Sequence, residues 1–395
     1  MTDTSEAQHL ARSFPAKPVS FVRGEGHQLF TADGTAYTDL GGASHGVANF
    51  GHSHPRIVAA IREQAGQLIH TTQTIPSPVR GEFLERLHRL VPAHLERSFL
   101  ANSGTEAVEA ALKHAVAATG RTRIVAMRNS FHGRTLGALA ATFRLQYREP
   151  FQALLPPVDF VPLNDAAALE AAVTDATAAI IVEPVQGEGG LAVADDAWLR
   201  TAQRIAHDHG ALLIIDEVQT GLGRTGRDLA IDTTGVQPDI LILGKSLAGG
   251  LPIGVACMTQ AVAARMPAGG HGTTFGGSPL VCAAASAALN VLRDERLAAR
   301  AAESGDRLRS ALGRIASPLV REVRGRGLMV GVDLRVRAQG ALDQLLSRRM
   351  LALGAGPTVV RLLPPLAIPT AELDAAAAAL AEALDGMAPA MEART

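Results

Sequence analysis

A single lysine stands where a buried strand is expected to end. Lys245 lies in DILILGKSLAGGLPIG, between an apolar run and a segment rich in glycine. The chain has only three lysines (Lys17, Lys113 and Lys245), and arginine supplies the rest of its 37 basic residues. Arginine stays protonated, whereas a desolvated lysine amine can lose its proton and act as a nucleophile or base. Lys245 is therefore the first candidate for a catalytic residue.

Ionisable groups also end two of the other strands that the sequence predicts. Glu183, Asp216 and Lys245 each follow a run that is apolar on both faces, which is typical of parallel strands buried inside a sheet. Ligands of open α/β sheets bind at the carboxyl ends of the strands. We therefore expect the three groups to face one crevice, although a residue in such a place can also simply cap a loop. The four apolar runs are RIVAM (123–127), AAIIVEP (178–184), ALLIIDE (211–217) and DILILGK (239–245).

The segment ANSGTEAVEAALKHAVAATG has the pattern of an anion site at the start of a helix. Ser103, Gly104 and Thr105 precede a helical run that Gly120 is expected to end. Free N–H groups at a helix start bind anions, and small residues allow a phosphate to approach closely. The alternative is that Ser103 or Thr105 only caps the helix.

Three further residues are candidates for binding a flat, anionic ligand. In NSFHGRTLGALA, Phe131 can cover a ring and Arg134 can bind a carboxylate. A core phenylalanine and a surface arginine are the alternatives. Arg361 lies inside the apolar run VVRLLPPL, where a guanidinium needs an acidic partner or an anionic ligand.

Together these parts meet the needs of a pyridoxal phosphate site. Such a site needs an amine that condenses with the cofactor aldehyde (Lys245) and a phosphate cradle (103–105). It also needs a cover for the ring (Phe131). A carboxylate must keep the pyridine nitrogen protonated so that the ring accepts electrons, and Asp216 suits this task.

The chain resembles the class III (ornithine-type) aminotransferases of fold type I over nearly its whole length. The matching motifs follow the order of that family: NSGTEAVEAALK, FHGRTL, EPVQGEGG, IIDEVQTGLGRTG, DILILGKSLAGGLPIG, HGTTFGGSPL and VVRLLPPL. The resemblance implies pyridoxal 5′-phosphate as cofactor and a homodimer with active sites at its interface. Small departures are Gly244 and Ser246 beside the lysine, Val108 after the phosphate turn, and Ser44 and His45 at the expected substrate mouth.

The resemblance also implies roles for cofactor-binding residues. Lys245 would carry the cofactor and Asp216 would pair with the pyridine nitrogen. The remaining cofactor contacts would come from Ser103, Gly104 and Thr105 at the phosphate, Phe131 and Val218 on the two ring faces, Gln219 at the ring hydroxyl, and Thr274 of the neighbouring subunit at the phosphate.

The substrate-binding residues implied by the resemblance are Arg134, Glu188, Thr273 and Arg361. Arg134 would bind the distal part of the substrate, and Arg361 would bind the α-carboxylate of glutamate or 2-oxoglutarate. Glu188 would pair with Arg361 when that carboxylate is absent, because an unpaired buried guanidinium is costly. One site could then serve two dissimilar substrates.

Within the family, four segments are most similar to the lysine-biosynthesis branch. They are QTIPSPVRGEF, YREPFQALLPPVDFVPLND, MPAGGHGTTFGGSPL and ASPLVREVRGRGLMVGV. This branch transfers the terminal amino group between glutamate and an aminoadipate semialdehyde tethered to a small acidic carrier protein (LysW), on the α-aminoadipate route. The alternatives are an N-acetylornithine or carrier-linked ornithine aminotransferase of arginine biosynthesis and, more distantly, an aminomutase. A relative that binds without turnover is disfavoured, because Lys245, Asp216 and Thr105 are all intact.

Composition excludes several other classes. A net charge of −1 gives no reason to expect nucleic acid or a membrane as partner, and no apolar run reaches the length of a membrane span. We expect no metal, because the pairs His52/His54 and His207/His209 lack a third ligand nearby. No G-x-G-x-x-G motif follows a strand, which disfavours a dinucleotide site. Two cysteines in apolar surroundings and no leader segment indicate a reduced, cytoplasmic protein.

The alternation of strands and helices predicts an α/β fold: a large domain with a mostly parallel central sheet and a smaller α+β domain. The large cofactor-binding domain would span 51–290. The small domain would combine an N-terminal arm and hairpin (1–50) with the C-terminal part (291–395). Asp33-Gly34 marks the hairpin turn, and helices are expected over 56–69 and in the alanine-rich segment that starts at Thr370.

Overall fold

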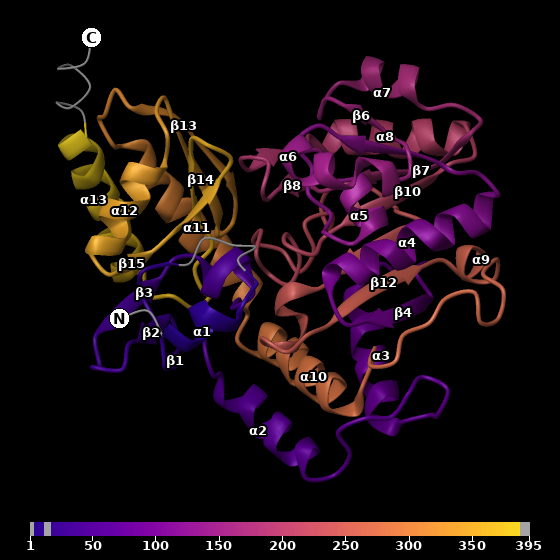
Figure 1. The fold of residues 1–395 in the computed structure, drawn as a ribbon, viewed down its shortest axis with the longest axis horizontal. Coiled ribbons are helices and arrows are strands. Elements are labelled where there is room, and N and C mark those ends of the chain that lie inside the picture. Colours follow the sequence, from indigo (N-terminus) through magenta and orange to yellow (C-terminus); the bar gives the residue numbers. More distant parts are fainter. Residues whose placement is uncertain (1–3, 12–16, 388–395) are drawn as a thin grey trace.

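The computed structural model describes residues 4–11 and 17–387, which form a large α/β part and a smaller part beside it (Figure 1). A seven-stranded sheet, ordered β4-β12-β11-β10-β7-β5-β6, is the centre of the large part. Its strands are β4 (Arg97–Ala101), β5 (Arg123–Met127), β6 (Val158–Val161), β7 (Thr177–Val182), β10 (Leu212–Asp216), β11 (Ile240–Leu243) and β12 (Gly254–Met258).

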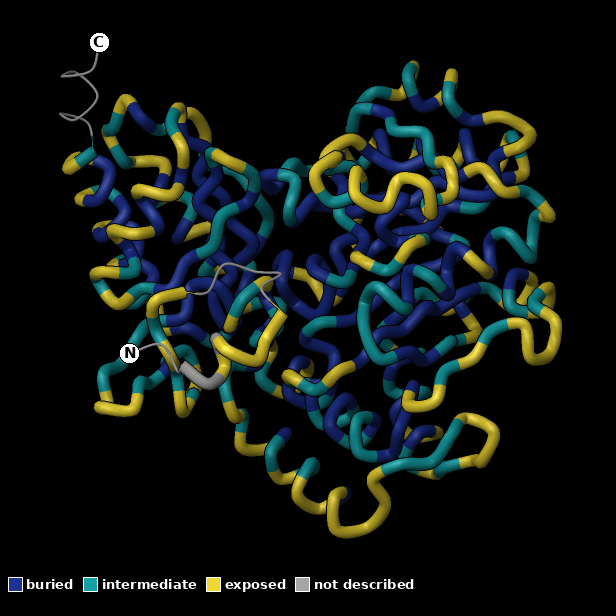
Figure 2. The backbone as a smooth tube through the Cα atoms, in the orientation of Figure 1, coloured by how far each residue is buried: buried dark blue, intermediate teal, exposed yellow. Residues whose placement is uncertain are grey.

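The strands from β11 to β6 run parallel, and β12 is antiparallel to both of its neighbours. Every residue of β7, β11 and β12 is buried, as their uninterrupted apolar sequences require (Figure 2). This arrangement confirms the predicted mostly parallel sheet. After β5 and β6 the chain crosses to the other side of β5 and adds β7, β10 and β11 in turn, so the strand order reverses beside β5.

Helices cover the sheet and connect its strands. Helix α4 starts at the predicted phosphate turn and ends before Gly120, whose φ of 70° is the left-handed conformation that glycine adopts easily. Helix α2 ends four residues earlier than predicted, at Ala65 before Gly66. The helices of this part are α2 (Pro55–Ala65), α3 (Pro78–Leu90), α4 (Gly104–Thr119), α5 (Leu136–Ala140), α6 (Leu145–Arg148), α7 (Ala166–Ala172), α8 (Asp196–Asp208), α9 (Gln260–Ala263) and α10 (Pro279–Asp294), with shorter helices η2 (Glu149–Leu154) and η3 (Lys245–Ala248).

The two ends of the chain meet in the smaller part. The predicted hairpin is present: β2 and β3 pair across the Asp33-Gly34 turn, and β3 pairs in parallel with β15 from the C-terminal segment. Figure 1 shows the N-terminal strands beside the C-terminal elements. We therefore propose the boundaries 1–50, 51–290 and 291–395 for the two domains. The first segment also contains a short helix, α1 (Thr4–His9).

A second four-stranded sheet, ordered β13-β14-β17-β16, completes the smaller part. Its strands β13 and β14 form a hairpin, and the alanine-rich segment that was predicted to be helical is α13. Among the described residues, no helix is both long and apolar enough to pass through a membrane. The elements of this part are β1 (Arg23–Glu25), β2 (Gln28–Phe30), β3 (Ala36–Asp39), η1 (Gly42–Gly46), α11 (Leu297–Gly313), β13 (Val320–Arg326), β14 (Met329–Leu334), α12 (Gln339–Ser347), β15 (Met350–Leu351), β16 (Leu353–Ala355), β17 (Val359–Leu362) and α13 (Thr370–Met387); a two-stranded sheet of β8 (Val185–Gln186) and β9 (Ala192–Val193) lies in between.

Glu217, which follows β10, makes the folded protein more stable in acid than in base. Its carboxylate accepts from Ala230 N–H at 2.8 Å, Ile231 N–H at 3.0 Å and the Thr220 hydroxyl at 2.9 Å. Burial nevertheless outweighs these donors and raises the pKa of Glu217 from 4.5 to about 7. The folded chain thus holds this proton more tightly than the unfolded chain does, so the stabilisation is complete below pH 4.5 and is lost as the pH rises through 7.

We expect the free energy of unfolding to fall by up to about 3 kcal/mol between pH 4.5 and pH 8 through this group. Urea unfolding of the cofactor-free chain at several pH values measures the slope. Glu217→Gln removes the titrating group, so its slope becomes smaller even though its amide, facing two N–H donors, lowers stability at every pH. An unchanged slope in the variant would show that Glu217 is ionised throughout.

Candidate active site

The sheet brings the three predicted strand-end groups to one edge. Strands β7, β10 and β11 are neighbours and parallel, so Glu183, Asp216 and Lys245 all lie at their carboxyl ends. The turn after β5, which holds Phe131 and His132, joins them there. The cluster therefore forms where the strand order reverses, the usual place for a ligand in an open α/β sheet.

His132 is a site residue that the sequence analysis missed. Its Nδ1 lies 2.7 Å from Asp216 Oδ2, and both side chains are buried. Burial alone would lower the pKa of His132, but the hydrogen bond and the charge of Asp216, aided by Glu183, outweigh it and raise the pKa. The second carboxylate oxygen, Oδ1, accepts from Val218 N–H at 3.0 Å. These two contacts hold the Asp216 carboxylate in one orientation.

Glu183 connects two segments of the site. Its two oxygens accept from Phe131 N–H at 2.9 Å and from Gly187 N–H at 3.2 Å. Burial raises its pKa to about 7, against the opposing effect of His132. Glu183 therefore joins the turn that carries Phe131 to the loop that carries Glu188.

Lys245 lies where the chain leaves β11, in a conformation that is unusual for a residue with a side chain. Its φ is +47°, a backbone strain of the kind that persists at functional sites. Burial lowers the pKa of its amine, although Asp216 and Glu188 favour the charged form. Part of the side chain still reaches solvent. A lysine of this kind loses its proton more readily than an exposed lysine and can still meet a substrate.

The predicted phosphate turn forms the start of helix α4. Ser103 Oγ caps helix α4 by accepting from Glu106 N–H at 3.3 Å. The Thr105 hydroxyl is engaged elsewhere: it accepts from the N–H groups of Arg134 and Thr135, each at 3.2 Å. The free N–H groups at the helix start are available to an anion.

Phe131 and Arg134 border the opening of the site. The Arg134 guanidinium is exposed and stacks on Tyr147, 3.5 Å from the centre of that ring. Tyr147 in turn meets Phe131 edge to face, with ring centres 6.3 Å apart. Arg144 donates to the Glu188 carbonyl at 2.8 Å, which connects this border to the loop that carries Glu188. Tyr147 and Arg144 carried no signal in the sequence that distinguishes them from surface residues.

The pair expected between Arg361 and Glu188 is present. Arg361 is 1% exposed, and its NH1 donates to Glu188 Oε1 at 2.6 Å and to the Gly187 carbonyl at 2.8 Å. Burial alone would raise the pKa of Glu188, but the charge and hydrogen bond of Arg361 lower it, with help from His45 and Lys245. Gln219 Oε1 also accepts from Arg361, at 3.3 Å.

Gln219 links this pair to the segment around Ser44 and His45. Its Nε2 donates to the His45 carbonyl at 3.5 Å. Ala43, Ser44 and His45 have φ values of 43°, 78° and 61°, three strained residues in succession. Burial lowers the pKa of the His45 imidazole, and Glu188 opposes the shift. Ser44 and His45, where the chain departs from the family pattern, therefore lie next to the Glu188–Arg361 pair.

Thr273 and Thr274 lie on a loop at the edge of the sheet. Thr273 Oγ1 accepts from the side chain of Asn102 at 3.0 Å, next to the phosphate turn. Thr274 is exposed and makes no hydrogen bond to the described residues through its side chain.

The residues present fit pyridoxal phosphate. At the cradle, a Cβ added to Gly104 would lie 2.8 Å from Val218 Cγ1, so only glycine leaves the turn open. Within the described residues, the buried Arg361 Nε has no hydrogen-bond partner and is free for an anionic ligand. Lys245 would bind the cofactor aldehyde, Asp216 the pyridine nitrogen, and Gly104 and its neighbours the phosphate.

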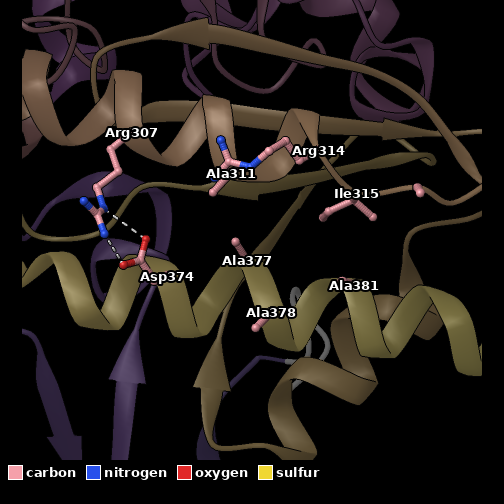
Figure 3. A pocket seen from close by; sticks show the side chains of 9 residues that line it. Arg307, Ala311, Arg314, Ile315, Asp374, Ala377, Ala378 and Ala381 are labelled. Carbon is pink, nitrogen blue, oxygen red and sulfur yellow. Dashed lines mark hydrogen bonds and ion pairs between the residues drawn. The ribbon is translucent and has the colours of Figure 1, made fainter.

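A groove elsewhere in the described residues does not belong to the site. A groove of about 520 Å³ lies between α11 and α13, bordered by the Arg307–Asp374 ion pair and several alanines (Figure 3), and it shares no residue with the cluster around Lys245. Among the described side chains, no group of three or more histidines, cysteines, aspartates or glutamates is placed to hold a metal ion.

Comparisons with known proteins agree with this site. A family model for class III aminotransferases matches residues 10–384. The chain is 47% identical to a [LysW]-aminoadipate semialdehyde transaminase of Deinococcus radiodurans, over 94% of this chain and 87% of that protein. It is 43% identical to an acetylornithine aminotransferase of Methanopyrus kandleri, over 93% and 94% of the two chains.

A solved structure shares the fold. An ornithine aminotransferase from Toxoplasma gondii, whose crystals contained pyridoxal phosphate at partial occupancy, has a TM-score of 0.93 and 33% identity, with 99% of this chain and 95% of that chain covered. The family match spans almost the whole chain, and Glu183, Asp216 and Lys245 lie together at the carboxyl ends of neighbouring strands. The chain therefore belongs to the class III aminotransferases, enzymes that use pyridoxal 5′-phosphate.

Proposed function

We propose that this aminotransferase moves a terminal amino group between a lysine tethered to an acidic carrier protein and 2-oxoglutarate, forming the tethered aminoadipate semialdehyde and glutamate. The observation that carries the proposal is the Arg361–Glu188 pair beside Lys245, a buried cation that can be neutralised in two ways. The similarity to the Deinococcus radiodurans protein supports the carrier-linked substrate.

Each residue has a defined task in this reaction. The bound cofactor supplies an electron sink for the bond that breaks at the substrate carbon. Lys245, whose pKa is lowered by burial, would accept the proton from that carbon and pass it on to the bound cofactor. Asp216, fixed by His132 and Val218 N–H, would keep the pyridine nitrogen protonated. Phe131 and Val218 would confine the ring, and Gln219 would contact its hydroxyl group.

Glu188 and Arg361 allow two dissimilar substrates to use one site. When glutamate binds, its α-carboxylate takes the place of Glu188 on the Arg361 guanidinium. A terminal amine has no carboxylate beside the reacting carbon, and Glu188 then neutralises the buried cation. Arg134, exposed at the opening, binds the distal carboxylate region of the substrate, and Thr273 completes the substrate contacts.

Removing the Glu188 side chain should separate the two substrates. We expect Glu188→Ala to lower kcat/KM for the terminal-amine donor about tenfold relative to kcat/KM for glutamate, because Arg361 is then buried without an anion only in the amine half-reaction. Glu295, which pairs with His54 in a half-exposed site, provides the control variant Glu295→Ala. Steady-state kinetics with both donors gives the ratio, and an unchanged ratio would refute the switch.

We also propose that the active form is a homodimer located in the cytoplasm. The exposed Thr274 supports a role across the interface, at the phosphate of the neighbouring subunit. The exposed side chain of Phe275 beside it supports the same assembly, because 62% of its surface is accessible. The two cysteines, Cys257 and Cys282, are buried and unpaired, as is usual in a reducing compartment.

The donor can be identified from the first half-reaction alone. Lysine tethered to its carrier and N-acetylornithine are mixed separately with the loaded enzyme in the absence of 2-oxoglutarate, and loss of the visible absorbance of the Lys245-bound cofactor is followed. Faster loss with the tethered lysine supports the proposal. Faster loss with N-acetylornithine favours the alternative, which the 43% identity to an acetylornithine aminotransferase supports. Product formation that continues over many turnovers without 2-oxoglutarate would indicate an aminomutase.

A further inference from the structure

Arg80 is a buried arginine whose guanidinium is held by the backbone rather than by an acid. It lies on α3 and is 7% exposed. Its Nε donates to the Gly277 carbonyl at 2.8 Å, NH1 to the Ile75 carbonyl at 3.0 Å, and NH2 to the carbonyls of Thr71 and Thr72 at 2.9 and 3.2 Å. No carboxylate of the described residues forms an ion pair with it. A buried cation that is held by backbone carbonyls in this way fixes the positions of the segments that carry those carbonyls.

The four carbonyls belong to two loops, 70–77 and 271–278, which are far apart in the sequence. Gln73 joins them again, since its Nε2 donates to the Gly276 carbonyl at 3.1 Å and to the Leu100 carbonyl of β4 at 2.9 Å. His70 Nδ1 lies 3.1 Å from the Ser278 hydroxyl. Arg80 is thus the centre of a junction between the two loops and the edge strand of the sheet.

This junction leads directly to the phosphate-binding residues. Strand β4 continues into Asn102, whose side chain donates to Thr273, and then into the turn at Ser103. The second loop carries Thr274 between the contacts at Thr273 and Gly277. The fit is tight, because a Cβ on Gly276 would lie 2.2 Å from the Leu100 carbonyl oxygen. The loop therefore has one position on β4, and Arg80 holds its far end.

We propose that Arg80 is a positioning residue for the cofactor phosphate. It does not contact the cofactor but fixes the loop that presents Thr274 and, through Asn102, stabilises the turn at Ser103. The inference rests on the proposed role of Thr274 across the dimer interface. It assigns to Arg80 an effect on the phosphate group in particular rather than on the ring or on folding as a whole.

The experiment compares two ligands that differ only in the phosphate. The cofactor-free full-length chain is titrated with pyridoxal phosphate and with pyridoxal, and binding is followed by quenching of the fluorescence of Trp198. For Arg80→Ala we expect at least about a tenfold weaker affinity for pyridoxal phosphate and less than about a twofold change for pyridoxal. Arg80→Lys should resemble Arg80→Ala, since an ammonium group lacks the planar set of five donors. Guanidinium ions should partly restore the affinity of Arg80→Ala.

Matched variants keep the test decisive. Arg86 is on the same helix but bonds only to Glu82, so Arg86→Ala should leave both affinities unchanged. Gln73 is exposed, so Gln73→Ala breaks the junction without opening the core and should reproduce the phosphate-selective loss even if Arg80→Ala does not fold. Equal losses for the two ligands, or no loss in either variant, would overturn the inference.

Thr274→Ala separates this inference from the proposed dimer site. A loss of phosphate affinity in Thr274→Ala without one in Arg80→Ala leaves the cross-subunit site standing and removes the role of Arg80. No loss in Thr274→Ala removes the cross-subunit phosphate contact and leaves Arg80 only its effect on the turn at Ser103. A phosphate-selective loss in both variants supports both proposals.

Discussion

Replacing Lys245 with arginine abolishes amino-group transfer, with an expected loss of at least about a thousandfold in the first half-reaction. The reason lies in the amine itself. Burial lowers the pKa of Lys245, so the group can lose its proton, bond to an aldehyde and act as a base. A guanidinium keeps its proton under the same conditions. Stopped-flow measurement of the half-reaction with excess amino donor gives the rate.

Two further measurements show that the loss has this cause. Borohydride treatment of the loaded wild-type enzyme should attach the cofactor to the peptide that contains Lys245, and should attach none to Lys245→Arg. Lys113 is exposed and contacts His271, so Lys113→Arg changes the same residue type away from the site and should keep the full rate. Added methylamine should restore part of the activity of Lys245→Ala. A Lys245→Arg enzyme that retained the wild-type rate would exclude a catalytic role for this residue.

The sequence was most informative about features that depend on the residues of a single strand or helix. Buried parallel strands are apolar on both faces, so their ends could be located, and Glu183, Asp216 and Lys245 do lie at one edge. The start of α4 and the glycine at its end were also predicted, because helix ends depend on local residue types.

Contacts between distant segments could not be predicted in this way. His132 and Asp216 are 84 residues apart, and nothing in FHGRT shows that the histidine turns inward. The Thr105 hydroxyl was assigned to the phosphate turn without knowledge of its contacts with Arg134 and Thr135. The helix predicted over 56–69 was too long, since the periodic pattern continues past Gly66 although the helix ends before it. Arg80 lies in QTIPSPVRGEF, a segment that contributed only to the resemblance, so its buried contacts were not predicted.

The contact between Asp216 and His132 determines the second large effect. Replacing Asp216 with asparagine should lower the rate of the first half-reaction by about a thousandfold, because a neutral amide does not keep a proton on the nitrogen that it faces. The substitution also removes the main group that raises the pKa of His132. Burial, which lowers that pKa, is then opposed only by Glu183, so the pKa of His132 should fall.

The shift in His132 gives a readout that is independent of turnover. Titration of the imidazole by NMR in the wild type and in Asp216→Asn compares the two pKa values directly. The Asp239–His207 pair has a similar separation, 3.0 Å, but its histidine is exposed and it lies at the opposite end of β11, so Asp239→Asn is the matched control and should keep the rate. A slow Asp216→Asn enzyme with an unchanged His132 pKa would mean that the carboxylate acts on the cofactor alone. A fast one would mean that the proton on the ring nitrogen does not depend on Asp216.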